Sequence, residues 1–224
     1  MSFNDQLNRW GRSVMDFLFP RRCPFCGVIA GKKLMCQHCA DTLPFTNENA
    51  VCEGAGFGRC ASPFYYEGNV RKAILDFKFK ANLGGLSCFG RLMAECAADN
   101  YAGQFDAITF VPISKKRLKK RGYDQTRYLT AATCVDWHVP PVETLRKVVD
   151  NLPQSSLQTA EERRANVLGV YEAIHVEQIK GKRLLLIDDI LTTGATLSEC
   201  VRILKEAGAA DVMCLTLART RKDQ

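Results

Sequence analysis

The sequence predicts an α/β protein with a mixed or parallel sheet, preceded by a small cysteine-rich element. Leu184–Ile187 is a run of aliphatic residues without alternation, which is typical of a strand buried on both faces. Thr196–Ala207 has helical periodicity and stops at Gly208, and Val212–Leu217 is a second apolar run. Strand, turn, helix and strand within about 35 residues indicate a βαβ unit. Further upstream, Ala107–Val111 and Thr144–Val148 are expected strands and Asp124–Cys134 an expected helix.

Composition limits the class of protein. A chain of 224 residues with 46% hydrophobic content has room for one α/β domain and a small appendage. No stretch approaches the roughly 18 apolar residues of a membrane span, and the first residues do not follow the pattern of a secretory signal. Eleven cysteines, an odd number, favour reduced thiols or metal thiolates over a disulfide framework. We therefore expect a cytoplasmic protein.

The chain divides into an amphipathic helix over residues 1–20, a cysteine-rich element over 21–62 and an α/β domain over 63–220. The helix is expected to dock on its own domain, with a partner or a membrane surface as the alternative.

Positive charge is concentrated in one segment. Of the formal net charge of +7, residues 115–127 carry most, through five lysines and arginines between Lys115 and Lys120, then Arg121 and Arg127. Such a cluster predicts either a local anionic partner or a solvated basic loop.

The cysteine-rich element contains two C-x-x-C pairs, which are Cys23 with Cys26 and Cys36 with Cys39. Two such pairs complete a closed tetrahedral site, so we predict a structural zinc that folds a segment too small to bury its own core. Independent redox motifs are the alternative, and His38 is expected to be a spectator. Whether Cys52 and Cys60 bind metal stays open. The remaining thiols are predicted to be small core residues: Cys88, Cys96, Cys134, Cys200 and Cys214.

Residues 184–196 carry the strongest functional signal. Asp188 and Asp189 follow the strand at the edge where α/β sheets bind ligands. The turn Thr192–Thr196 then enters a helix whose free N–H groups favour an anion. Gly194 permits close approach of a phosphate and a positive φ, and Thr196 is a candidate cap. Direct binding of Mg²⁺ by the aspartates, or a plain helix cap, are alternatives. The Walker pattern is absent, which argues against an ATPase.

These thirteen residues resemble the signature of type I phosphoribosyltransferases, which bind 5-phosphoribosyl-1-pyrophosphate (PRPP). The resemblance implies a mostly parallel sheet flanked by helices. It also implies that Asp188 and Asp189 contact the ribose and take part in catalysis. By position, it assigns the 5-phosphate to the turn: Thr192, Thr193, Gly194, Ala195 and Thr196.

A narrower resemblance covers nearly the whole chain from Pro20. Val111-Pro112-Ile113-Ser114 and Arg121-Gly122-Tyr123-Asp124-Gln125, then Gln154, Arg164 and Asn166, resemble landmarks of the ComF family, as does the four-cysteine element. The resemblance implies a link to natural competence and to handling imported single-stranded DNA, with DNA or the competence helicase machinery as partners. The resemblance to type I phosphoribosyltransferases places pyrophosphate at Ile113, Ser114 and Lys115, followed by a mobile basic loop in which Lys116–Arg121 supply cations, with Arg121 the preferred contact.

Whether turnover occurs is open. A transferase would displace pyrophosphate from C1 of PRPP, with Mg²⁺ neutralising the leaving group. The alternative is a nucleic-acid-binding or regulatory protein that binds PRPP without turnover, in which the basic cluster contacts phosphates and Tyr123 or Trp137 stacks a base. An ordinary purine or orotate salvage enzyme is a third interpretation, which the zinc element disfavours.

Overall fold

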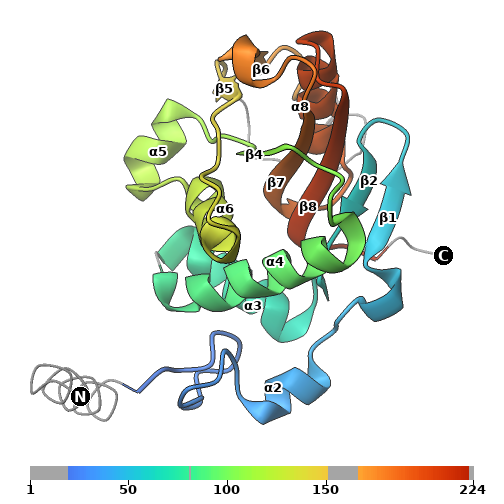
Figure 1. Ribbon diagram of the computed structural model, residues 1–224. Helices are drawn as coiled ribbons and strands as arrows, with labels where there is room; N and C mark the ends of the chain where they lie inside the picture. Colours follow the sequence, from blue (N-terminus) through green and yellow to red (C-terminus); the bar gives the residue numbers. More distant parts are fainter. Residues whose placement is uncertain (1–19, 81, 151–165, 222–224) are drawn as a thin grey trace, which may run out of the picture.

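The computed structural model describes residues 20–80, 82–150 and 166–221 (Figure 1). The expected helix over residues 1–20, apart from Pro20, lies outside these ranges, as do Gln154 and Arg164. Within the described ranges, none of the helices has the length and apolar character that crossing a bilayer requires.

A six-stranded sheet forms the centre of the molecule, in the order β1-β2-β8-β7-β4, with β3 also paired to β8. All its pairs are parallel except β1 with β2. The strands are β1 (Val51–Gly54), β2 (Gly58–Ala61), β3 (Phe64–Tyr65), β4 (Ala107–Phe110), β7 (Arg183–Leu191) and β8 (Asp211–Arg219). The predicted α/β class and mostly parallel sheet are confirmed.

Helices cover both faces of the sheet. The α-helices are α2 (Gln37–Thr42), α3 (Gly68–Lys80), α4 (Leu86–Tyr101), α5 (Lys115–Arg121), α6 (Gln125–Cys134) and α8 (Ala195–Glu206). Leu185 and Ile187 of β7 pack in one core cluster with side chains of α3, α4 and α6. Leu184 and Leu186 pack in a second cluster with α8. The unalternating aliphatic run is thus a strand buried on both faces, as predicted.

Shorter elements complete the described chain. β5 (Leu145–Lys147) and β6 (Tyr171–Ala173) form a separate antiparallel pair. The 3-10 helices are η1 (Asn47–Asn49), η2 (Leu83–Gly85), η3 (Val135–Trp137) and η5 (Val176–Gln178). All five cysteines predicted to be core residues are buried.

β7 is longer than the predicted strand. It continues through both aspartates to Leu191, whereas β4 ends at Phe110 opposite Ile187. Beyond that point β7 stays paired with β8, through Asp188 opposite Thr216 and Leu191 opposite Arg219. The aspartates therefore lie in the part of β7 that is paired with β8 but extends beyond the end of β4.

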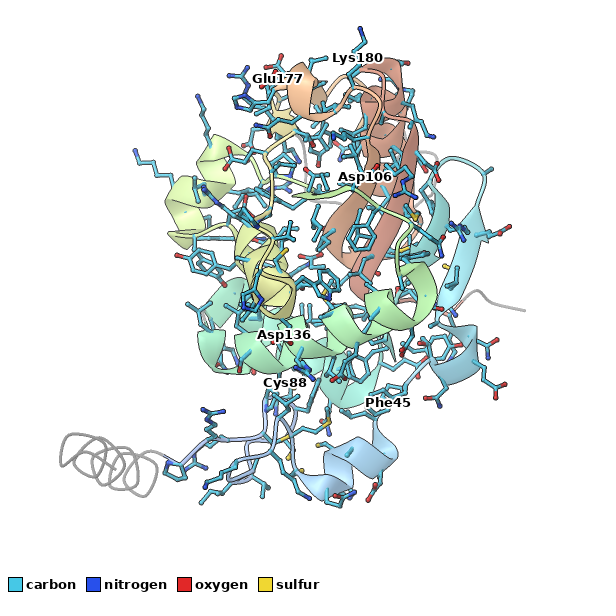
Figure 2. All side chains as sticks on the ribbon, in the orientation of Figure 1. Phe45, Cys88, Asp106, Asp136, Glu177 and Lys180 are labelled. Carbon is cyan, nitrogen blue, oxygen red and sulfur yellow. The ribbon has the colours of Figure 1, made fainter. Side chains whose placement is uncertain are left out.

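The cysteine-rich segment packs against the main domain through an aromatic cluster. Phe25 is 3% exposed, and its ring lies 5.5 Å from that of Phe64 and 5.7 Å from that of Phe89 on α4. Cys88 and Phe45 lie along the same border in Figure 2. The predicted division after residue 62 stays an expectation, although β2 pairs with β8 through Cys60 opposite Cys214.

We expect Phe25→Ala to lower the free energy of unfolding by about 3 kcal/mol, because it empties a buried aromatic site. Chemical denaturation of the metal-loaded protein measures the effect. Ile29→Ala is the matched control, since Ile29 belongs to the same segment and is 56% exposed. Equal stability of the two variants would show that the aromatic cluster does not hold the segment in place.

Candidate functional site

The turn between β7 and α8 has the geometry of an anion site. Gly194 adopts a left-handed φ of +79° and occupies the cap position of α8. A Cβ on Gly194 would lie 2.4 Å from the Phe57 ring, so both conformation and space require glycine there. Thr192 and Thr193 are exposed, and the cap residue Gly194 has no side chain to bond the first N–H groups of the helix. The first N–H groups of α8 thus remain suited to an anion.

The candidate cap at Thr196 is wrong. α8 begins at Ala195, one residue earlier than expected, so Thr196 lies inside the first turn. The hydroxyl of Thr193 instead accepts a weak hydrogen bond of 3.5 Å from the Ala195 N–H.

The two aspartates differ in their surroundings. Asp189 is 6% exposed, and its Oδ1 lies 3.0 Å from the Lys78 Nζ while its Oδ2 accepts a 3.5 Å bond from the Gln125 amide. Asp188 is half-buried, and its Oδ1 accepts a 2.8 Å bond from the Asp189 N–H. Burial, and then the charge of Asp189, raise the pKa of Asp188, whereas Lys78 opposes the shift. The pair therefore favours cationic or hydrogen-bond-donating ligands.

Lys78 was missed from the sequence. It belongs to α3, more than a hundred residues before the aspartates, and a single lysine between two phenylalanines gives no local signal. Its pairing with Asp189 arises only because the fold brings α3 to the end of β7.

The basic segment is a helix and not the expected mobile loop. Ser114 caps the start of α5, and its Oγ accepts a 3.2 Å bond from the Arg117 N–H; Gly122, in the left-handed conformation, caps the end of the helix. Arg121 folds back over the Phe79 ring at 5.1 Å. Burial lowers the pKa of Arg121, and the negative charge of Asp189 acts in the opposite direction.

Two of the residues predicted to bind pyrophosphate already make hydrogen bonds to other residues of this chain. The Ile113 N–H donates 3.3 Å to Asp124, and the Ser114 hydroxyl donates to Asp150. Lys115 is exposed.

The expectation that Tyr123 stacks a base is wrong, because Tyr123 is 9% exposed and its hydroxyl donates to the Phe77 carbonyl. Trp137 packs against Phe105, with ring centroids 5.7 Å apart.

A cavity of about 770 Å³ lies beside the turn. Its walls come from the β1–β2 hairpin, the first half of α8 and the ends of β7 and β8, including Phe57, Thr192, Thr193, Ser198 and Arg219. Asp188 and Asp189 are not among its lining residues, so this cavity adjoins the turn and does not extend to the acidic pair.

The four predicted zinc ligands form one cluster. The sulfur atoms of Cys23, Cys26, Cys36 and Cys39 all lie within 4.8 Å of one another. The Sγ of Cys36 also accepts a 3.4 Å bond from the Cys39 N–H at the start of α2. Four cysteine sulfurs at this separation fit a closed, structural zinc site. His38 is exposed and is not part of the cluster.

Cys52 and Cys60 lie opposite each other in the β1–β2 ladder. Within the described ranges they belong to no group of metal-binding side chains.

Comparisons with known proteins agree with this architecture. Residues 97–224, more than half of the chain, match the family model of the phosphoribosyl transferase domain, and residues 14–74 match that of the double zinc ribbon domain. The chain therefore belongs to the phosphoribosyl transferase domain family, among its ComF-type members.

Three curated relatives match over most of their own length. Competence protein ComFC of Bacillus subtilis is 25% identical over 93% of this chain and 82% of its own. Competence protein F of Haemophilus influenzae is 29% identical over 82% and 84%. DNA utilization protein YhgH of Salmonella typhi is 26% identical over 88% and 84%. Among solved structures, a glutamine PRPP amidotransferase from B. subtilis aligns with a TM-score of 0.43 at 19% identity, over 64% of this chain and 30% of that one.

We expect the purified protein to contain about one zinc per chain, because the structure brings one set of four sulfurs together. Cys36→Ser should reduce the zinc content and destabilise α2, since this residue caps the helix and binds the metal. Cys52→Ser is the matched control and should leave the zinc content unchanged. Metal analysis by mass spectrometry checks both variants. A loss of zinc from Cys52→Ser would show that the zinc site includes Cys52, against this prediction.

Proposed function

We propose that this protein binds PRPP together with Mg²⁺ at the end of β7, in a role connected with competence or DNA utilization. The observation that carries the proposal is the order of three features along β7 and the turn that follows it. Two carboxylates on the extension of β7 come before a turn that requires glycine, and the N-terminus of α8 follows at once. The match of residues 97–224 to the phosphoribosyl transferase domain supports it.

In this proposal each group has a chemical role. Asp188 and Asp189 accept hydrogen bonds from the ribose hydroxyls, and the N–H groups of residues 193–196 bind the 5-phosphate. Mg²⁺, when bound with PRPP, supplies charge neutralisation at the pyrophosphate. Lys78 neutralises Asp189 before the ligand arrives, so PRPP must compete with an ion pair that lies 3.0 Å apart and is largely buried.

If the protein is a transferase, an acceptor forms a bond to C1 of the ribose as the bond from C1 to pyrophosphate breaks. The cations that face the acidic pair then offset the charge of the departing pyrophosphate. Arg121 is suited to this role, because it is held in place over Phe79.

A DNA-related role is supported by two observations. The relatives named above are competence and DNA utilization proteins. In addition, four lysines of α5 project into solvent, which are Lys115, Lys116, Lys119 and Lys120. An exposed cationic helix is suited to phosphate backbones. We propose that it contacts single-stranded DNA, and that the protein acts in the cytoplasm, as its eleven cysteines without a disulfide favour.

One test of the proposal concerns the acidic pair. Calorimetric titration of PRPP with Mg²⁺ should show clear binding to the wild type. The double variant Asp188→Asn/Asp189→Asn should bind at least about tenfold more weakly, which corresponds to about 1.4 kcal/mol, because amides replace the acceptors of the ribose hydroxyls.

Asp106→Asn is the matched control for this titration. Asp106 pairs with Arg183 at the start of β7, at 2.7 Å. That end of the strand is about 16 Å from Asp188 at the ordinary rise per residue. Equal PRPP binding by the wild type and the double variant would overturn the role of the carboxylates.

A separate test concerns the binding of DNA. Binding of a single-stranded oligonucleotide, followed by fluorescence anisotropy, should weaken steeply as salt rises from about 50 to 200 mM. Lys115→Ala/Lys119→Ala/Lys120→Ala should weaken binding and flatten the salt dependence. Lys180→Ala/Lys182→Ala removes two exposed lysines elsewhere and should have little effect. The same salt dependence in both variants would exclude α5 as the contact.

A further inference from the structure

Two aromatic rings on the surface of the molecule have no ligand in the proposed function. Among the phenylalanine, tyrosine and tryptophan side chains of residues 20–80, 82–150 and 166–221, only Phe79 and Tyr128 are exposed. Phe79, on α3, is 66% exposed, and Tyr128, on α6, is 45% exposed. The site described above uses Phe79 only as a support for Arg121, and it does not use Tyr128.

Both rings lie beside the C-terminal end of α5. Arg121 is the last residue of this helix, and its guanidinium carbon is 5.1 Å from the centroid of the Phe79 ring. The Tyr128 ring is edge-on to that of Tyr123, two residues beyond the helix, with the centroids 6.0 Å apart. The Tyr123 ring also lies 6.1 Å from that of Phe77 on α3. Separate contacts therefore bring the two exposed rings to the same end of α5.

This end of α5 carries positive charge that the described part of the chain does not neutralise. Lys119 and Lys120 lie in the last turn of the helix, are exposed, and form no ion pair with a carboxylate of the described ranges. The acidic groups close by have partners already. Asp124 accepts hydrogen bonds from two backbone N–H groups at the start of α6, and Asp189 pairs with Lys78. The surface around the rings is therefore suited to an anion from outside the chain.

We propose that Phe79 and Tyr128 stack on the bases of a single-stranded DNA whose phosphates contact α5. This inference rests on the proposed contact between α5 and DNA, and it adds a site for the bases. Aromatic rings beside a cationic surface hold single strands in this way, because every base has a flat π-face whatever the sequence. Cations bind the phosphates of single and double strands alike, so the exposed rings supply a preference for single strands.

Arg121 orders the Phe79 ring before DNA arrives. Its guanidinium lies over the ring, and the attraction between a cation and a π-system favours this arrangement. The ring is 66% exposed despite the contact, which leaves surface for a base. In a duplex the faces of the bases are covered by their neighbours in the stack. An unpaired strand is therefore the form of DNA that can offer its bases to Phe79 and Tyr128.

The test measures the binding of two oligonucleotides by fluorescence anisotropy. One is a single-stranded oligothymidine, and the other has the same number of phosphates but abasic sugars throughout. The proteins are the wild type, Phe79→Ala, Phe79→Trp, Tyr128→Ala and the matched control Val176→Ala. Val176 is an exposed apolar residue of η5, at 46%. Ile179, just after η5, packs in the cluster of α8, on the face of the sheet opposite to α3.

Phe79→Ala and Tyr128→Ala should each bind oligothymidine more weakly, by about fivefold or more, because each variant loses a stacked base. Both should bind the abasic strand as the wild type does and should keep the wild-type salt dependence, because the phosphate contacts are unchanged. Phe79→Trp should retain the affinity for oligothymidine, and Val176→Ala should bind both strands as the wild type does.

The abasic strand separates stacking from a structural role. If Phe79→Ala weakens the binding of both strands equally, Phe79 acts only by positioning Arg121, and the inference is overturned. Wild-type affinity of either alanine variant for oligothymidine would overturn the role of that ring. If the wild type binds neither strand, the proposed contact with DNA and this inference fall together. If the wild type binds both strands equally well, the contact between α5 and phosphates stands and the stacking alone fails.

Discussion

The site depends on the unequal lengths of two neighbouring strands. β4 stops opposite Ile187, whereas β7 continues to Leu191 with β8 still paired along its other edge. The backbone that carries Asp188 and Asp189 is therefore fixed by a sheet on one side and open on the other. Carboxylates on a strand are held more firmly than carboxylates on a loop, which favours recognition of a ligand with a fixed arrangement of hydroxyls. The turn at Gly194 follows from the same extension, because it begins where β7 ends.

Charge balance is the second requirement of this arrangement. Two adjacent acids at a strand end need cations, and the fold supplies them from other parts of the chain. Lys78 comes from α3, which precedes the segment matched to the phosphoribosyl transferase domain. Arg121 comes from the end of α5 and is held over Phe79, the residue next to Lys78. The N-terminal half therefore takes part in the electrostatics of the acidic pair as well as in the sheet.

Local patterns allowed much of this structure to be predicted from the sequence. The βαβ unit, the zinc cluster and the left-handed Gly194 each depend on residues close together in the chain. The full length of β7 does not follow from the sequence, because its apolar run ends at two charged residues, although β8 continues to pair with the strand beyond them. α5 was taken for a loop because of its charge, despite the cap at Ser114 and the stop at Gly122. The pairing of Lys78 with Asp189 depends on a contact distant in sequence, which no local pattern reveals.

The outer edge of β8 is covered by β2 and β3, which come from residues 58–65. A fragment cut to the matched segment would begin at residue 97 and would leave that edge bare along a nine-residue strand. Unpaired strand edges recruit other chains. Such a fragment should be prone to self-association, and the two halves of this protein are better regarded as one folding unit than as modules that can be exchanged.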